Sequence, residues 1–281
     1  MLSLLRQNRI LCYIHVTMDR FFTILAILVV VLFLLKIIVF KKRALRDTAP
    51  LPQNFRSILE GQVDFYGQLS VEKKQEFEKR MMLFLSGVKI TGIKTTVEDL
   101  DKVLIAASAL IPIFAFPDWE YPNLNEILLY PGSFNDSFEH EGPGRDTLGL
   151  VGSGAYQNIM ILSQQHLRED FANRTGKTNT AVHEFVHLID KTDGEVNGVP
   201  ESLLSRQYVL PWIKMIHEKI KQIMEENSDI NPYGATNEAE FFAVAAEYFF
   251  ERPDLLQENH PELYDMLVRI FRQQPVITLQ N

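Results

Sequence analysis

Residues 183–187 read His-Glu-Phe-Val-His, with two histidines four positions apart and a glutamate directly after the first. On an α-helix, side chains at i and i+4 share a face, so both imidazoles can bind one metal ion. Glu184 lies about 100° round the helix from His183, where it can reach a water at the metal without being a ligand. The pattern therefore predicts one Zn²⁺ per chain, bound by His183 and His187, with Glu184 as the general base.

Chance is a weak alternative explanation for this pattern. With 7 histidines in 281 residues, the pattern is expected by accident only about 0.01 times. On a helix predicted over 178–191, the histidines and Asp190 fall opposite an apolar stripe formed by Val182, Phe185, Val186 and Ile189. Two surface histidines on such a helix remain the alternative to a metal site.

A catalytic zinc site needs a third protein ligand and keeps a fourth position open. No other histidine has the spacing of the metzincin ligand, so we expect a carboxylate from a later helix, predicted over 237–251. Glu240 and Glu247 share one face of that otherwise apolar helix, and carboxylates in such a setting are usually paired or metal-bound. We predict Glu240 as the third ligand, and Glu247 as a group that orients a histidine ring. A salt-bridged surface position is the alternative for Glu247, and Asp190 is a further candidate for orienting a ring.

The elements around this site predict an α+β domain. Apolar runs bounded by turn residues predict strands over 88–94, 125–130 and 158–163. Helical periodicity predicts helices over 71–84, 99–110, 178–191, 202–226, 237–251 and 261–273. We expect the strand over 158–163 to pair with a substrate backbone as an added strand, with Ile159 and Ile161 as substrate-binding residues.

The N-terminal leader carries an apolar run from Phe21 to Phe40, interrupted only by Thr23 and Lys36. Twenty helical residues span about 30 Å, the thickness of a bilayer core, so we expect a transmembrane helix over about 21–40. A cleaved signal peptide is the alternative, but Lys41-Lys42-Arg43 is not a cleavage sequence. The basic residues after the run predict a single-pass protein with its body in the cytoplasm, most clearly if translation starts at Met18.

Composition sets the remaining limits. The expected organisation is a leader over 1–46, a linker over 47–53, a main domain that carries the zinc site over 54–275 and a tail over 276–281. The chain has 28 basic and 36 acidic residues, and eight of the basic ones lie in the leader, so the body is acidic and nucleic acid is not an expected partner. The single cysteine, Cys12, excludes an internal disulfide and a cysteine-based zinc site in the body.

Several motifs together resemble the zinc peptidase family of the Mlc titration factor (MtfA-like proteins). They lie in order along roughly residues 54–275: 118–121 (Asp-Trp-Glu-Tyr), 126–131 (Glu-Ile-Leu-Leu-Tyr-Pro), 183–190, 193–200 and 239–250. Residues 233–242 are also similar to a stretch in the catalytic domain of anthrax lethal factor, which has a related site.

The resemblance implies a mixed, zincin-like metallopeptidase fold with an active-site helix and a second ligand helix. It implies that His183, His187 and Glu240 bind zinc, that Glu184 is the base, and that Tyr233 is an electrophilic helper. Peptides or proteins are the implied substrates, and the founding member also binds a sugar-responsive repressor. The expected N-terminal transmembrane helix, which would place the protein in the lipid bilayer, departs from those soluble proteins. A membrane-tethered regulatory binding protein, with its metal retained for structure, is therefore the alternative function.

Overall fold

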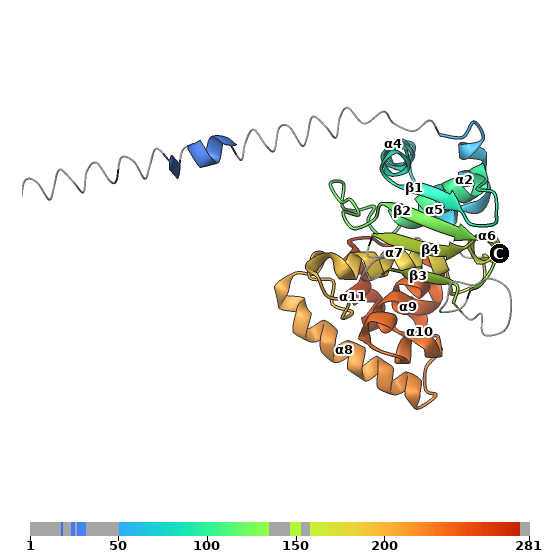
Figure 1. Cartoon of the computed structure of the whole chain (residues 1–281). Coiled ribbons are helices and arrows are strands. Elements are labelled where there is room, and N and C mark those ends of the chain that lie inside the picture. Colours follow the sequence, from blue (N-terminus) through green and yellow to red (C-terminus); the bar gives the residue numbers. More distant parts are fainter. Residues whose placement is uncertain are drawn as a thin grey trace, which may run out of the picture. The chain divides into compact units, whose positions relative to one another are not determined.

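A computed structural model describes residues 51–134, 147–152 and 158–275, together with 18, 24, 25 and 27–31 near the N-terminus (Figure 1). The chain divides into two compact units, residues 1–47 and 48–281. Most of the membrane span expected over 21–40 lies outside the described residues. Within the described residues, the structure contains no helix with the length and apolar character needed to cross a bilayer.

The second unit is built on a four-stranded mixed sheet in the order β1-β2-β4-β3. Its strands are β1 (Lys89–Gly92), β2 (Glu126–Tyr130), β3 (Gly149–Val151) and β4 (Ile159–Ser163). Strands β1, β2 and β4 are parallel, and β3 pairs with β4 in the antiparallel direction, with Leu150 opposite Ile161. Strands β1, β2 and β4 confirm the three predicted strands, whereas their parallel direction and strand β3 were not predicted.

Alternation along β4 sends its side chains to two different clusters. Met160 and Leu162 enter the main core, whereas Ile159 and Ile161 join a smaller cluster with Tyr130 and Phe134. The backbone of β4 is hydrogen-bonded to β2 on one side and to β3 on the other. The prediction that 158–163 pairs with a substrate is therefore wrong, because an interior strand has no free edge. In the described part of the sheet, β3 is the edge strand beside β4.

Helices supply most of the second unit, and they cover the sheet and form the site. They are α2 (Phe55–Gln62), α3 (Asp64–Gly67), α4 (Val71–Gly87), α5 (Asp99–Leu110), α6 (Gln164–Ala172), α7 (Thr180–Asp190), α8 (Arg206–Met224), α9 (Glu238–Glu251), α10 (Pro253–Asn259) and α11 (Pro261–Phe271). The mixture of helices with a small mixed sheet confirms the α+β class. Two of these helices were not predicted: α6, which is short and polar, and α10, which begins at a proline.

Helices α7 and α9 pack against one another in the main core. Phe185 and Val186 of α7 are fully buried, as are Phe241 and Ala243 of α9. Small residues such as Ala243 allow the two helices to approach closely, so polar side chains on their facing edges can meet. Helix α7 also lies against β3 and β4, which places it between the sheet and α9. In Figure 1, α7 runs beside β4 and β3, and α9 lies below them.

Asp229 fixes the loop that leads from α8 to the short 3₁₀ helix η3 (Pro232–Ala235). Its carboxylate accepts hydrogen bonds from Tyr248 Oη at 2.6 Å, Lys177 Nζ at 2.6 Å and His260 Nε2 at 2.7 Å. Partial burial works against the charge, but the hydrogen bonds outweigh it and hold the pKa of Asp229 well below its ordinary value.

We expect Asp229→Ala to lower the free energy of unfolding by about 1–3 kcal/mol at pH 7, because several donors lose a charged acceptor. A carboxyl group whose pKa is depressed by folding contributes stability above its unfolded pKa, and that stability is lost as the pH falls through the folded value. The difference between wild type and variant should therefore shrink below about pH 4. Urea unfolding across pH measures it, with the exposed Asp265→Ala as control; a difference independent of pH would contradict the assignment.

Candidate metal centre

Helix α7 carries the His-Glu-x-x-His residues and begins where Asn179 caps it. The Asn179 side chain accepts a hydrogen bond from the Val182 N–H at 3.1 Å, which is the usual role of an asparagine at a helix N-cap. Asn179 is fully buried, and its own backbone N–H donates to Glu247 Oε2 at 2.7 Å. The cap therefore ties the start of α7 to α9 and fixes the rotation of α7 about its axis.

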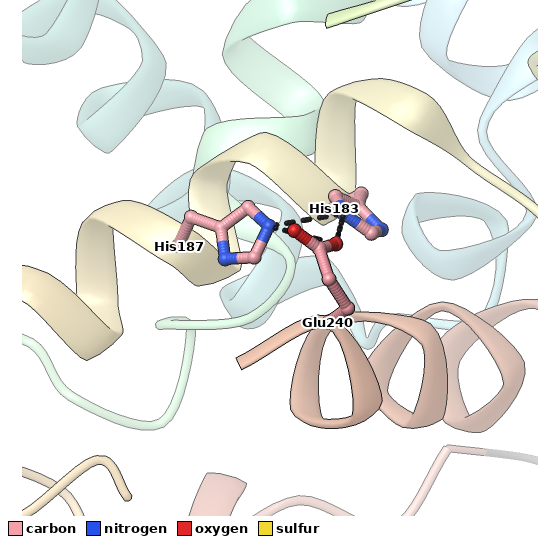
Figure 2. A group of neighbouring side chains, drawn as sticks. All are labelled: His183, His187 and Glu240. Atoms are coloured by element: carbon pink, nitrogen blue, oxygen red, sulfur yellow. Dashed lines mark hydrogen bonds and ion pairs between the residues drawn. The ribbon is translucent and has the colours of Figure 1, made fainter. Parts of the chain in front are cut away.

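Three side chains from α7 and α9 converge on one point (Figure 2). His183 Nε2 lies 3.0 Å from Glu240 Oε2, and His187 Nε2 lies 3.3 Å from the same oxygen. The two Nε2 atoms are 3.0 Å apart. The potential ligand atoms of His183, His187 and Glu240 all lie within 4.8 Å of one another, so this group could hold a metal ion. In α9 the Asn237 side chain caps the helix by accepting from Glu240 N–H at 2.9 Å, which places Glu240 in its first turn.

The donor set fits a divalent cation. His183 Nδ1 faces the carboxylate of Glu247, so that nitrogen is the one that carries the proton in the neutral ring. The unprotonated Nε2 then points at the Glu240 oxygen, and two acceptors at 3.0 Å need a proton or a cation between them. Two imidazole nitrogens and a carboxylate oxygen are typical ligands of zinc and related metals.

The electrostatics of the centre also favour positive charge. Burial opposes charging of the His183 ring, but the hydrogen bonds to Glu240 and Glu247 outweigh it and raise its pKa to about 10. Burial likewise opposes ionisation of Glu240, yet the hydrogen bonds from His183 and His187 lower its pKa to about 2. The carboxylates of Glu240 and Glu247 thus stabilise a positive charge on His183 when no metal is bound. The same negative charge would stabilise a divalent cation at this centre.

Glu247 lies behind His183 and determines how its ring is turned. Glu247 Oε1 is 2.6 Å from His183 Nδ1, and Oε2 accepts the Asn179 backbone N–H at 2.7 Å. Glu247 is only 5% exposed, so the surface salt bridge considered from the sequence is not its environment. A carboxylate in this position fixes the tautomer and orientation of a ligating histidine.

We expect Glu247→Gln to weaken metal binding by about 10–100-fold, because the amide fits the space but no longer accepts as an anion. Competition with a fluorescent zinc chelator measures the affinity. The matched control is Glu258→Gln on the exposed surface of α10. An affinity equal to wild type would show that Glu247 does not orient His183.

Glu184 does not join the three converging side chains, which agrees with a role other than ligand. It is 6% exposed, and burial raises its pKa, with His183 and His187 partly offsetting that rise. A carboxylate with a raised pKa is a stronger base, which suits a group that accepts a proton near neutral pH.

Tyr233 lies at the rim of the centre in η3. Its ring centroid is 6.0 Å from that of His183, and the residue is 54% exposed. The Asn231 side chain accepts its backbone N–H at 3.0 Å, which holds the start of η3. Partial burial and the charge of Glu240 raise the pKa of Tyr233, so its hydroxyl keeps its proton and can act as a donor.

Asp190 does not hydrogen-bond either histidine. Its Oδ2 instead accepts the Gly198 N–H at 2.7 Å, which fixes the loop after the 3₁₀ helix η2 (Lys191–Asp193). In the part of the chain that the structure describes, Asp190 Oδ1 and His187 Nδ1 are both buried without a hydrogen-bond partner. In this arrangement the Asp190 carboxylate holds the loop at Gly198 rather than a histidine ring.

The structure thus brings together His183, His187, Glu240 and Glu247 at one centre, with Glu184 and Tyr233 beside it, and it does not bring Ile159 or Ile161 there. Sequence reasoning missed Asn179 as the residue that joins α7 to Glu247. Its capping position was visible in the sequence, but its backbone bond to a residue 68 positions away was not.

A mixed α+β domain in which a His-Glu-x-x-His helix and a later glutamate form one centre is an arrangement of metallopeptidases. This chain belongs to the family described as Glucose-regulated metallo-peptidase M90, which it matches over residues 38–272. The match confirms the resemblance to the Mlc titration factor family.

Individual relatives agree with this assignment. Protein slr2042 of Synechocystis sp. is 33% identical over 241 residues, which cover 81% of this chain and 86% of the relative. Mlc titration factor A of Pectobacterium atrosepticum is 28% identical over 230 residues, covering 76% and 84%. Mlc titration factor A of Serratia proteamaculans is 32% identical over 190 residues, covering 60% and 70%.

Proposed function

We propose that this chain is a zinc-dependent peptidase that hydrolyses peptide bonds with Glu184 as the general base. The observation that carries the proposal is the convergence of His183, His187 and Glu240, with a buried glutamate next to them that is not one of the three. A metal kept only for structure is usually closed by a fourth protein ligand and does not need such a glutamate. Membership of a metallopeptidase family supports the same conclusion.

The chain's own residues account for the proton transfers of the reaction. When bound, a zinc ion supplies positive charge that polarises the scissile carbonyl and makes water more acidic. Glu184 accepts the proton of the attacking water and later passes it to the leaving amine. The Tyr233 hydroxyl donates a hydrogen bond to the oxyanion that develops on the substrate. Glu247 keeps the His183 ring turned toward the centre throughout.

The edge of β3 is the place where we propose that the substrate backbone binds. Ser163 N–H donates to the Leu148 carbonyl and Gly152 N–H to the Ile159 carbonyl, both at 2.9 Å. In an antiparallel pair the backbone groups of alternate residues face the partner, so those of Gly149 and Val151 face away from β4. Phe134 bridges this edge at Thr147, and no described strand pairs with it over Gly149–Val151. A peptide added there would run beside α7, with affinity supplied by its backbone rather than by its sequence.

The proposal is tested on the full chain purified in detergent. We expect about one zinc per chain and cleavage of some members of a panel of quenched fluorescent peptides. A chelator should remove both the metal and the activity, and added zinc should restore the activity. Stoichiometric zinc without cleavage of any peptide or denatured protein would contradict the proposal.

The name of two relatives favours a second candidate function. Two relatives named here are called Mlc titration factor A, a name that describes action on Mlc rather than peptide hydrolysis. By analogy, this chain would bind a protein regulator and use its metal for structure. The Glu184→Gln variant distinguishes the two candidates. A peptidase would lose hydrolysis of peptides, whereas a binding protein would still bind its partner as the wild type does.

We further propose that the leader anchors the protein in a membrane, with the second unit in the cytoplasm. The apolar run over 21–40 supports this, as do the exposed apolar side chains of Ile24, Leu25 and residues 27–31. The full chain should resist carbonate extraction from membranes, and a variant with Leu28→Asp and Val30→Asp should be released. A C-terminal reporter active only outside the cytoplasm should give no signal; a strong signal would overturn the orientation.

A further inference from the structure

Gly149 in β3 lies directly against the side chain of Glu184. A Cβ atom placed on Gly149 would be 2.6 Å from Glu184 Cγ, 2.6 Å from Oε1 and 2.9 Å from Cδ. These separations are shorter than non-bonded carbon contacts, which are optimal at about 3.5–4.0 Å. Any residue other than glycine at this position therefore requires the Glu184 side chain or the β3 backbone to move.

The backbone conformation does not explain the glycine. Among the described glycines, only Gly194 and Gly198 have a positive φ, so Gly149 has a conformation that other residues can adopt. Glycine weakens a strand interior, because it loses more conformational entropy and has no side chain to pack. Where a glycine occurs in a strand without a special φ, close approach of another group is the usual reason. Here that group is the side chain of Glu184.

The neighbours of Gly149 show why the space matters. Val151, two residues along the same face of β3, packs against the main core. The edge of β3 that faces away from β4 is the proposed position of the substrate backbone. The space above Gly149 thus lies between α7, which carries Glu184, and the strand along which the peptide would lie.

We infer that Gly149 is a positioning residue for the general base: the absence of a side chain lets the Glu184 carboxylate lie between α7 and the edge of β3. This inference rests on the proposed function for its catalytic consequence. A methyl group at position 149 would displace the carboxylate from the position in which it can accept a proton from water. The backbone groups of residue 149 that face the substrate would be unchanged, so substrate affinity should be little affected.

The first test is the kinetics of Gly149→Ala. We expect kcat to fall about 10–100-fold, the loss typical when a reacting group is misplaced by about 1 Å. KM and the zinc content should stay close to wild type. The matched control is Gly132→Ala, because a Cβ there would meet only Gln165 Oε1, at an ordinary 3.5 Å. A kcat within twofold of wild type would overturn the inference.

The second test does not depend on peptidase activity. Gly149→Ala should lower the melting temperature of the wild-type chain by several degrees, because the added methyl group crowds the Glu184 side chain. In a Glu184→Ala background the same change should cost nothing, because the added methyl group enters the space that Glu184 has left. An equal loss in both backgrounds would show that Gly149 does not position Glu184.

The two tests together separate the inference from the proposed function. If the wild-type chain cleaves no peptide, the proposed function fails, and the melting temperatures still decide whether Gly149 and Glu184 are coupled. If the wild-type chain is active and the melting temperatures show no coupling, the positioning role fails alone.

Discussion

Glu184→Gln should reduce kcat for peptide hydrolysis by about 10²–10⁴-fold while the protein keeps its full complement of zinc. Glutamine has the size of glutamate and can occupy the same buried space, but it cannot accept a proton from water at neutral pH. Because Glu184 is not one of the three converging side chains, its replacement leaves the ligand atoms in place. Metal analysis and kcat measured on one preparation therefore separate loss of the base from loss of the metal.

The control for this variant is Glu169→Gln, an exposed position on α6 whose carboxylate accepts a hydrogen bond from Gln165 Nε2 at 2.8 Å. It should match wild type in both measurements. Retained turnover in Glu184→Gln would refute the assignment of the base, and loss of zinc would show that Glu184 contributes to binding. The variant is also suited to trapping substrates from native membranes, because it should bind a peptide without cleaving it.

The helices that carry the centre are predictable because their signals are local. The periodicity of α7 and α9 is complete within each segment, and Asn179 and Asn237 mark the two starts as capping residues. The face shared by His183 and His187, and that shared by Glu240 and Glu247, follow from helix geometry alone. The convergence of these two faces depends on how α7 and α9 pack together. The apolar face of each helix indicated that both helices are packed in the core.

The parts that escaped prediction depend on contacts between distant segments. Strand β3 is three residues long and becomes a strand only by pairing with β4. Because β3 occupies the edge of β4, it also overturns the prediction that β4 pairs with a substrate. Whether a strand is interior or at an edge cannot be recognised from its own residues. The contact between Gly149 and Glu184 has the same origin, because it joins positions 35 apart through the packing of α7 on β3.

Three glutamates near two histidines make the centre rich in negative charge. Glu240 contacts both rings, Glu247 turns one of them, and Glu184 is buried beside them. Each carboxylate raises the cost of ionising the next in a buried setting, and a divalent cation relieves that cost.

We therefore expect the metal to stabilise the folded chain as well as to support the reaction. A chelator should lower the melting temperature of the wild-type chain.

Glu240→Gln should abolish high-affinity zinc binding and, with it, peptide hydrolysis. The amide keeps the shape of the side chain but lacks the negative charge that both imidazoles face at 3.0 and 3.3 Å. We expect the affinity to fall by more than about 100-fold, the upper end of the loss seen when only a supporting partner of a ligand is changed. Excess zinc should restore part of the activity, because Glu184 is still present.

The matched control is Glu238→Gln, two residues earlier in α9, where the carboxylate is exposed and contacts His217 at 3.2 Å. It tests the effect of removing one negative charge from the same helix end without touching the centre, so its zinc affinity should equal that of wild type. Isothermal titration of the metal-free proteins with zinc gives both affinities directly. If Glu240→Gln binds zinc as tightly as Glu238→Gln, then Glu240 is not a ligand and a different carboxylate must complete the site.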